Sequence, residues 1–254
     1  MTEEQTQYKV KEAAKGGGGF AKYRALYYGD ASIGRVVLCE LLITLFGWIP
    51  GALGLVLRSK LYPLMFPGIG KKVVFGRDVT IRHPHKIKIG NNAVIDDNCV
   101  IDAKGDGNDG ITIGGNVYIG RNTIVYCKGG DIVLEDGVNI SSNCQIFSSN
   151  NLLIKQGTMI GAYSYFLSGG EYDYEDSTPF AEQSGMCTRG PLVIGVNCWF
   201  GARVTVLDAA CVGDHCVIAA GAVVNKPVAA DSIAVGVPAK IIKSISASAN
   251  NTEG

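Results

Sequence analysis

The sequence predicts an all-β fold, a solenoid built from short parallel β-coils. Over residues 194–224 an apolar side chain recurs at every sixth position, and the next residue is mostly glycine or alanine. A period of six fits neither the 3.6-residue period of a helix nor the two-residue period of a half-buried strand. It is typical of hexapeptide solenoids, in which three units complete one triangular coil. The recurring positions are Ile194, Phe200, Val206, Val212, Ile218 and Val224.

The same spacing begins near Val73 and continues, with interruptions, up to this ladder. We expect these side chains to point to the axis of a prism and to stack coil on coil, each contributing roughly 1.5–3 kcal/mol. Interruptions at 104–110 and 128–131 predict surface loops, and 168–190 predicts a long polar insertion. The whole predicts roughly six to seven coils. The upstream inward positions are Phe75, Ile81, Ile89, Ile95, Ile101, Ile113, Ile119, Val125, Leu134, Ile140, Ile146, Ile154, Ile160 and Phe166.

Two further positions of the six-residue unit have a constant character. The fourth position is rich in asparagine and glycine, which tolerate the positive φ that a sharp corner needs. The fifth position is small, and Cys99, Cys144, Cys198 and Cys216 occupy it, so we expect them to be small core residues. The chain has no CxxC pair, which disfavours a zinc or disulfide framework. Reduced cysteines favour a cytoplasmic location.

Composition and the bounds of the six-residue repeat divide the chain into five parts. Its 254 residues carry 23 basic and 23 acidic groups, which argues against a nucleic-acid binder. Residues 1–19 lack the apolar core of a signal peptide and predict a disordered leader with a flexible joint at Gly16–Gly19. A helical extension is expected over 20–70 and the solenoid over 71–230. A cap of one strand and one helix is expected over 231–245, followed by a disordered tail at 246–254.

The most apolar stretch, residues 36–57, lies within the helical extension. It is about as long as the ~20 residues that span a bilayer. Glu40 within it and the Trp48–Gly51 break argue against a simple span. Arg35, Arg58 and Lys60 flank it, and we favour a helix–break–helix that dips into one leaflet or lies on it, with Trp48 and Tyr62 at the interface. A helical hairpin packed on the solenoid or on a neighbouring subunit, and a true span, are the alternatives.

The sequence resembles a known family. The ladder from Ile194, the hexads of 212–224 (VGDHCVIAAGAVV) and the tail of 234–240 (AVGVPAK) are similar to the left-handed β-helix acyltransferases, especially their bacterial polysaccharide and lipid-cluster members. The resemblance covers 72–242. It implies a homotrimer with three intersubunit active sites, using acetyl-CoA or another acyl-CoA as donor and no metal.

The resemblance also implies residues that line the donor groove. They lie in the last coils and near the cap, where the two lysines would meet the phosphates of the donor as point charges. Solvated lysines with no ligand role are the alternative. These positions are Trp199, Gly201, Ala219, Ala220, Gly221, Lys226 and Lys240.

A catalytic base is expected in the insertion. Relatives carry a histidine in a stretch that reads GGxHDY, whereas 169–174 read GGEYDY and place Tyr172 at the histidine position. Tyrosine has a reference pKa near 10 and is a weak base, so Glu171 and Asp173 are further candidates. His83, His85 and His215 are expected to be structural, and they do not gather into a zinc site.

Three functions follow. The first is acyl transfer to a hydroxyl or amine of a sugar or lipid-linked glycan, at the inner face of the cytoplasmic membrane. The second is a catalytically silent trimeric scaffold, which the substitution at Tyr172 favours. The third is an enzyme of shifted chemistry that uses Glu171 or Asp173 as base.

Overall fold

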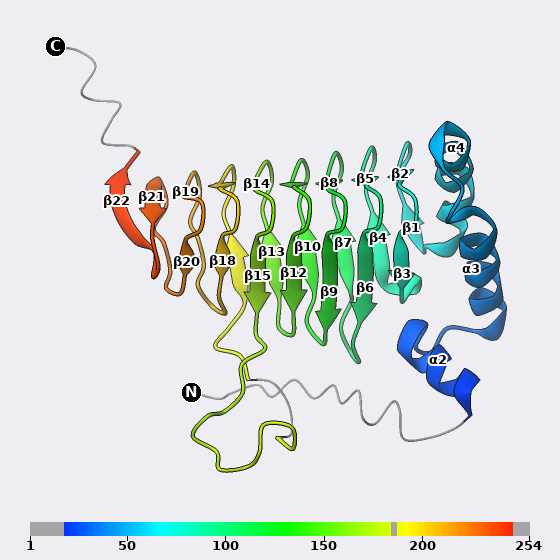
Figure 1. The fold of residues 1–254 in the computed structure, drawn as a ribbon, viewed down its shortest axis with the longest axis horizontal. Coiled ribbons are helices and arrows are strands. Elements are labelled where there is room, and N and C mark those ends of the chain that lie inside the picture. The colour runs from blue at the N-terminus through cyan, green and yellow to red at the C-terminus, as the bar shows by residue number, and fades with distance from the viewer. Residues whose placement is uncertain (1–17, 184–186, 246–254) are drawn as a thin grey trace.

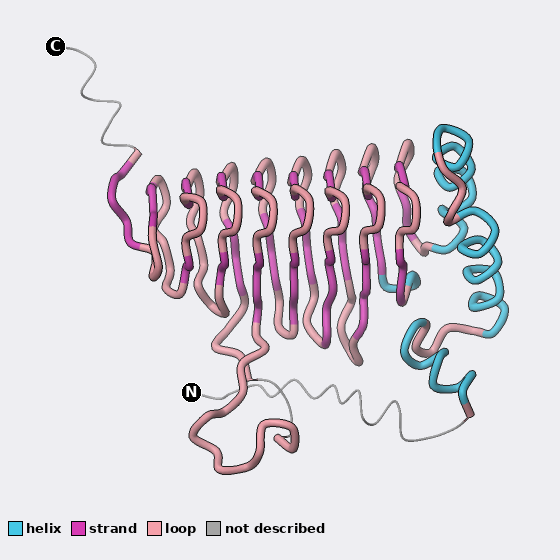
Figure 2. Tube along the Cα trace, viewed as in Figure 1, coloured by secondary structure: helices cyan, strands magenta, loops and turns pink. Residues whose placement is uncertain are grey.

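The computed structural model describes residues 18–183 and 187–245, and it is a parallel β-solenoid closed at one end by helices (Figure 1). The predicted leader, apart from Gly18 and Gly19, and the predicted tail lie outside the described residues. Three sheets form the sides of a triangular prism, and consecutive strands of the chain pass from the first sheet to the second and third in turn. The helices gather at the N-terminal end of the prism (Figure 2).

Each sheet stacks one short strand per coil in parallel register. The first sheet contains β1 (Gly68–Ile69), β4 (Ile87–Ile89), β7 (Ile111–Ile113), β10 (Ile132–Leu134), β13 (Leu152–Ile154) and β16 (Leu192–Ile194). The second contains β2 (Val74–Phe75), β5 (Val94–Ile95), β8 (Tyr118–Ile119), β11 (Asn139–Ile140), β14 (Met159–Ile160), β17 (Trp199–Phe200), β19 (Val217–Ile218), β21 (Ser232–Val235) and β22 (Lys240–Ser244). The third contains β3 (Thr80–Arg82), β6 (Val100–Lys104), β9 (Ile124–Lys128), β12 (Gln145–Ser148), β15 (Tyr165–Ser168), β18 (Thr205–Val206) and β20 (Val223–Val224).

The predicted inward positions form the core. Every one of them, from Phe75 to Val224, is at most 4% exposed. The parallel pairing of the strands stacks apolar residues on apolar residues: Ile140 pairs with Ile160, and Ile160 with Phe200. Cys99, Cys144, Cys198 and Cys216 are buried free thiols, as predicted. The fold class and the core are therefore confirmed.

The corners also behave as the sequence predicts. The fourth-position asparagines and glycines, such as Asn143 and Gly157, have φ near +60° or +70°. The same conformation occurs at Tyr163 and Arg203, where the residue type gave no warning, and at His215, a residue type that adopts left-handed φ more readily than most. The stacked coils impose the corner, and the side chain tolerates it.

The C-terminal cap differs from the prediction. In place of a strand and a helix, β21 and β22 form an antiparallel pair at the edge of the second sheet. Gly236, with φ +93°, and Pro238 reverse the chain between them. The β-branched pair Ile241–Ile242 then favours an extended strand over a helix.

The N-terminal extension is helical, as predicted, and packs across the first coil. It comprises α2 (Gly19–Tyr27), α3 (Ile33–Phe46), α4 (Gly51–Leu61) and the 3₁₀ turn η1 (Tyr62–Met65); a second 3₁₀ turn, η2 (Pro84–Lys86), lies within the first coil. Arg58 is buried and donates hydrogen bonds to the carbonyls of Phe46, Ile49 and Phe75, which ties the helix break to the solenoid. Across the described ranges no helix has the length and apolar character needed to cross a bilayer. Tyr62 is fully buried against Phe75, so its predicted place at a membrane interface is wrong.

Candidate functional site

The insertion leaves the prism at the corner between the third and first sheets. It connects β15 to β16, and one carboxylate holds both of its stems. Asp208, almost fully buried in the next coil, accepts hydrogen bonds from the backbone N–H of Gly169 on one stem and of Arg189 on the other, each at 2.5 Å. The Thr188 hydroxyl also donates to it at 3.3 Å. Asp208 therefore fixes where the insertion starts and ends.

Sequence reasoning missed Asp208. A signal was present, because an acidic residue occurs two positions after the inward Val206, in a ladder that is otherwise apolar or small at its buried positions. A buried carboxylate in such a ladder requires donors, since an unpaired buried charge is costly. The donors come from the insertion, which lies about 20–40 residues earlier in the chain.

Glu171 is held at the base of the insertion. Its backbone forms an antiparallel bridge with Cys187, and its carboxylate accepts a hydrogen bond from the Arg189 guanidinium at 2.6 Å. Both side chains of this ion pair are about half exposed. The carboxylate is therefore oriented by a cation and open to solvent.

The other two predicted catalytic residues lie further out. Tyr172 is 45% exposed, and its ring faces that of Phe180 at a centroid distance of 6.0 Å. The Asp173 carboxylate accepts hydrogen bonds from the backbone N–H of Glu175 at 2.9 Å and of Asp176 at 3.3 Å. Asp173 thus stabilises a turn of the insertion, and Glu171 is the better-placed carboxylate of the two.

The predicted donor-groove residues lie on another side of the molecule. Trp199 projects from β17 on the outer side of the second sheet and is 59% exposed. Gly201, Ala219, Ala220 and Gly221 form the corner that follows this sheet. Packing alone requires glycine at Gly201, because a Cβ added there would lie 2.5 Å from the backbone nitrogen of Ala220, and the positive φ of Gly221 favours glycine at that corner.

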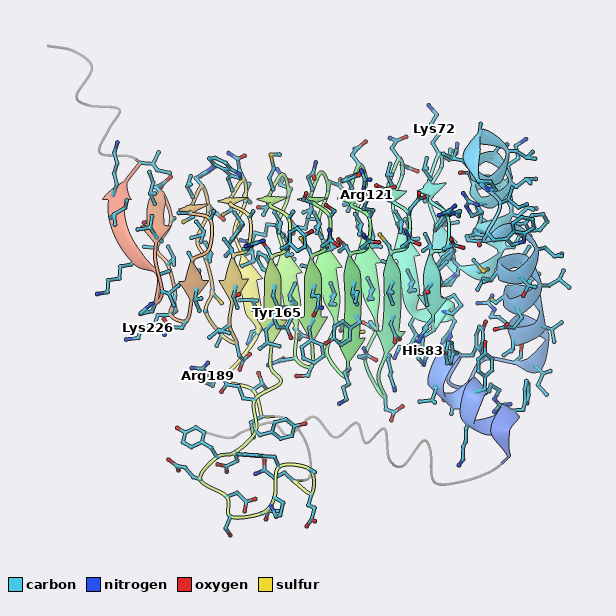
Figure 3. All side chains as sticks on the ribbon, in the orientation of Figure 1. Lys72, His83, Arg121, Tyr165, Arg189 and Lys226 are labelled. Carbon is cyan, nitrogen blue, oxygen red and sulfur yellow. The ribbon has the colours of Figure 1, made fainter. Side chains whose placement is uncertain are left out.

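The two predicted lysines are on different sheets of the last coils. Lys226 follows β20 at the corner from which the insertion leaves, and it lies along the same edge of the prism as Arg189 and His83 (Figure 3). Lys240 begins β22 at the edge of the second sheet. The backbone N–H of Ala239, the residue before Lys240, donates to the carbonyl of Val223 in β20 at 2.8 Å, so the two lysines lie on neighbouring segments at the C-terminal end of the prism.

The predicted base and the predicted donor face are therefore on opposite sides of one prism. The insertion leaves between the third and first sheets, whereas Trp199 is on the second sheet, which is the side opposite that corner. Within one chain the structure brings Glu171, Tyr172 and Arg189 together and leaves Trp199 apart.

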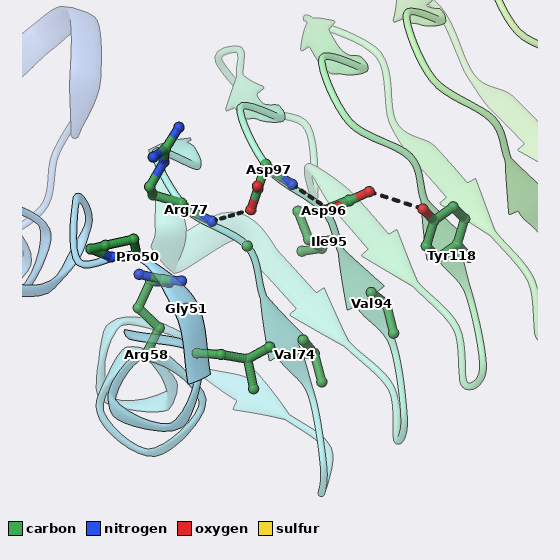
Figure 4. A pocket seen from close by; sticks show the side chains of 12 residues that line it. Pro50, Gly51, Arg58, Val74, Arg77, Val94, Ile95, Asp96, Asp97 and Tyr118 are labelled. Carbon is green, nitrogen blue, oxygen red and sulfur yellow. Dashed lines mark hydrogen bonds between the residues drawn. The ribbon is translucent and has the colours of Figure 1, made fainter. Parts of the chain in front are cut away.

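The second sheet also has a groove at its N-terminal end (Figure 4). Val74 and Val94 form its floor, and α4 and Arg77 border it. Tyr118 lines the same groove and donates a hydrogen bond to Asp96 at 2.9 Å. Ladder register places Val74, Val94 and Tyr118 in the column that leads through Met159 to Trp199.

The third sheet has an aromatic outer surface that the sequence analysis did not single out. Tyr126 stacks beside the buried Phe147, at a ring distance of 4.7 Å, and neighbours Tyr165. Burial, and next the interaction with Tyr165, raises the pKa of Tyr126 to about 12. These hydroxyls therefore stay protonated near neutral pH and act as donors or acceptors of hydrogen bonds.

The histidines have structural surroundings, as expected. His83 is buried, has a left-handed φ of 54°, and hydrogen-bonds through Nδ1 to Asp102 at 3.1 Å. Burial, and next the neighbouring His83, lower the pKa of His85. His215 occupies a corner beside Asn197. Among the described residues no group of three or more His, Cys, Asp or Glu side chains is placed to hold a metal ion.

Comparisons with known proteins agree with this architecture. The family model described as bacterial transferase hexapeptide (six repeats) matches residues 191–226, and the hexapeptide repeat of succinyl-transferase matches 68–103. A candidate lipopolysaccharide-biosynthesis O-acetyl transferase of Escherichia coli (strain K12), WbbJ, is 30% identical over 143 residues, which cover 54% of this chain and 73% of that protein. A candidate acetyltransferase of Staphylococcus aureus (strain Mu50) is 30% identical over 126 residues, 43% of this chain. The chain spans 63% of the length of that relative.

A solved structure shares the fold. AntD, an N-acyltransferase from Bacillus cereus crystallised with dTDP and 3-hydroxybutyryl-CoA, superposes with a TM-score of 0.51 at 23% identity, over 74% of this chain and 87% of that one. The fold and the repeats define a hexapeptide-repeat protein. With the WbbJ match, the chain belongs to the hexapeptide-repeat acyltransferase family.

Proposed function

We propose that this chain is an acyl-CoA-dependent acyltransferase, most simply an acetyltransferase, that modifies a hydroxyl or amine of a sugar or lipid-linked glycan. Family membership supports the reaction class, and the name of the WbbJ relative supports a glycan acceptor. The observation that carries the proposal is the oriented carboxylate of Glu171 at the base of a polar insertion.

The proposed site lies between subunits of a homotrimer. The insertion of one chain would face the second sheet of its neighbour, because Glu171 and Trp199 are on opposite sides of the same prism. Trp199 and the small corner residues would receive the narrow pantetheine arm. Lys226 or Lys240 would meet the phosphates of the donor.

Each protein group has a part in the proposed reaction. Glu171 takes the proton of the acceptor hydroxyl or amine, because its carboxylate is oriented by Arg189 and open to solvent at the base of the insertion. The acceptor oxygen or nitrogen attacks the thioester carbonyl carbon, and backbone N–H groups stabilise the oxyanion. The intermediate collapses, the C–S bond breaks, and the CoA thiolate leaves with the proton that Glu171 took from the acceptor, which restores the carboxylate. Arg189 positions Glu171, and Tyr172 lines the acceptor side.

We place the activity in the cytoplasm, with lipid-linked acceptors reached at the inner face of the cytoplasmic membrane. All eight cysteines are free thiols and six of them are buried, which fits a reducing compartment.

Thiol release from acetyl-CoA, measured with a panel of amino- and hydroxysugars, tests the activity. Glu171→Gln should lower kcat at least about 100-fold, as expected for loss of a general base. The matched control is Glu175→Gln, a change of the same kind in the same insertion, and it should retain the rate. Equal rates for both variants would refute the assignment of Glu171.

Mixed trimers test the intersubunit site. Glu171→Gln and Trp199→Ala should each be inactive alone. Co-refolded at equal amounts, they should regain about a quarter of the wild-type rate, because some interfaces then combine two intact residues. No recovery in mixtures shown to contain both chains would contradict a shared site.

A silent trimeric scaffold is the second candidate, and Tyr172 at the histidine position of the family motif favours it. In that case the protein would bind CoA without releasing thiol with any acceptor. Thiol release that appears only in Tyr172→His would support this alternative and the positional mapping together.

A further inference from the structure

The helical cap has two apolar sides, and the solenoid covers one of them. Val36, Cys39 and Leu42 of α3 are buried toward the first coil. On the opposite side of the same helix, Val37 and Leu41 are more than half exposed. A helix that is apolar all round is normally covered all round, in a protein core or in lipid.

The uncovered side extends over the whole cap. We call it the cap face; its members are large apolar side chains, each between 37% and 66% exposed, on α2, α3, α4, η1 and the turn between α3 and α4. Monomeric soluble proteins seldom expose so continuous an apolar surface unless it binds something. The members are Phe20, Ile33, Val37, Leu38, Leu41, Leu45, Trp48, Leu53, Leu55, Val56 and Leu64.

The one acidic group within this surface is satisfied internally. Glu40 accepts hydrogen bonds from the hydroxyls of Tyr23 and of Tyr28, the latter at 2.5 Å. Burial, and next this hydrogen bond, raises the pKa of Tyr23 to about 12, so the tyrosine remains a donor at physiological pH. Glu40 therefore joins α2 to α3 through its Oε1 atom, which accepts from both tyrosines.

The charges around the cap face are mainly positive. Of the cap helices, Lys22, Arg24, Arg35 and Lys60 reach solvent, against the acids Asp30 and Glu40, and Glu40 is bonded to two tyrosines; Asp78 of the first coil, beside the helix break, pairs with Arg77. Arg58 is buried, and its guanidinium donates to backbone carbonyls, so it does not contribute to the charge at this surface. An apolar surface with cations at its edge complements an anionic lipid surface, where each basic side chain near the headgroups contributes about 1 kcal/mol.

We infer that the cap face docks on the surface of an anionic bilayer, with α3 parallel to the membrane and the prism axis normal to it. The helices lie across the end of the prism, so burying their outer side fixes this orientation (Figure 1). This replaces the idea of a hairpin that inserts into one leaflet: the three helices act as a plate on the headgroup boundary.

The orientation has a consequence for the acceptor, which rests on the proposed function. Four strand spacings of about 4.8 Å separate β3 from β15, so the insertion stands roughly 20 Å above the first coil. The layer of cap helices adds about 10 Å. A lipid-linked acceptor must therefore carry a glycan long enough to extend well above the headgroups.

Vesicle flotation of the full chain tests the docking. The variant Leu41→Gln/Leu53→Gln changes two side chains of the cap face that are 54% and 66% exposed. The matched control, Ile241→Gln/Ile242→Gln, changes side chains that are 50% and 64% exposed on β22 at the other end of the prism. Thermal melts should show both variants folded, because neither pair is buried.

Wild type and control should float with phosphatidylcholine/phosphatidylglycerol vesicles, more weakly at high salt, and the cap variant should lose at least about tenfold in partitioning. Wild-type flotation by the cap variant, or no flotation of any protein, would overturn the inference. The inference would also be overturned if the wild type and the control self-associate without lipid and the cap variant does not. The cap face would then be a contact between two copies of the chain. Thiol release is not part of this readout, so its result is independent of the acyl-transfer assay.

Discussion

The coils and the insertion of this protein are held in different ways. In the coils each inward residue is buried between similar residues one coil above and one below, as Phe200 is between Ile160 and Ile218. The insertion has no such column. Its two stems are joined by hydrogen bonds to Asp208, and its interior is stabilised by hydrogen bonds to its own side chains, such as Asp173. The repeats supply stability, and the segment that does not repeat supplies the candidate chemistry.

The largest contrast should come from truncating one aromatic in each region. Phe200→Ala empties a fully buried position in contact with Phe166, and it should lower the free energy of unfolding by about 3–5 kcal/mol. Phe180→Ala in the insertion, where the ring is 57% exposed, should change it by about 0.5 kcal/mol or less. Urea unfolding measures both, and similar losses would show that the insertion is part of the cooperative core.

The anchor of the insertion should be the next most sensitive point. Asp208→Ala leaves the buried N–H of Gly169 and the partly buried N–H of Arg189 without an acceptor, at a cost of about 1–3 kcal/mol. We expect faster cleavage by a glutamate-specific protease within the insertion and a loss of thiol release.

Asp214→Ala is the control for this anchor, because Asp214 also accepts a backbone N–H, that of Val196, but is about half exposed. It should leave cleavage of the insertion unchanged. If the insertion of Asp208→Ala is cleaved as slowly as that of the wild type, Asp208 does not position the insertion.

The corners of the coils offer a smaller effect with opposite expectations at two neighbouring sites. Asn143→Val places a β-branched residue at a φ of +59°, which should cost about 1–2 kcal/mol. Asn139→Val, on β11, places the same residue in a strand, where it is favoured, and should cost nothing or stabilise slightly. Thermal melts of the two variants should therefore diverge; a shared loss would mean that the asparagine side chains, not the backbone angle, set the corner.

The smallest effect concerns pH at the first coil. The pKa of His85 is lowered by burial and then by His83, Lys86 and Arg35, with Asp30 opposing them. As pH falls below about 6.5, the unfolded chain binds a proton that the folded chain resists, so stability should decline with acid. His85→Gln should flatten the melting temperature between pH 7 and pH 5. His215→Gln, at an exposed corner, should not.

Much of the fold could be predicted because its determinants are local and periodic. The inward positions repeat every six residues, and corner glycines and asparagines mark the turns. The prediction was wrong for the C-terminal helix, because the outcome depended on an open edge of the second sheet that accepts β22. It was also wrong for Tyr62, whose burial depends on Phe75 in the first coil.

The candidate site was predicted only in part. The insertion and the location of Glu171, Tyr172 and Asp173 within it followed from the break in the period. The pairing of Glu171 with Arg189 did not, since it depends on how the two stems of the insertion meet.

The sequence by itself determined the solenoid, its core and the position of its insertion, because a strict period dictates which side chains are buried. The tertiary structure alone decided how Asp208 anchors the insertion, how Tyr23 and Tyr28 satisfy Glu40, and which side of the cap remains bare. These features depend on contacts between residues 12 to 39 positions apart in the chain, and no local pattern records such contacts.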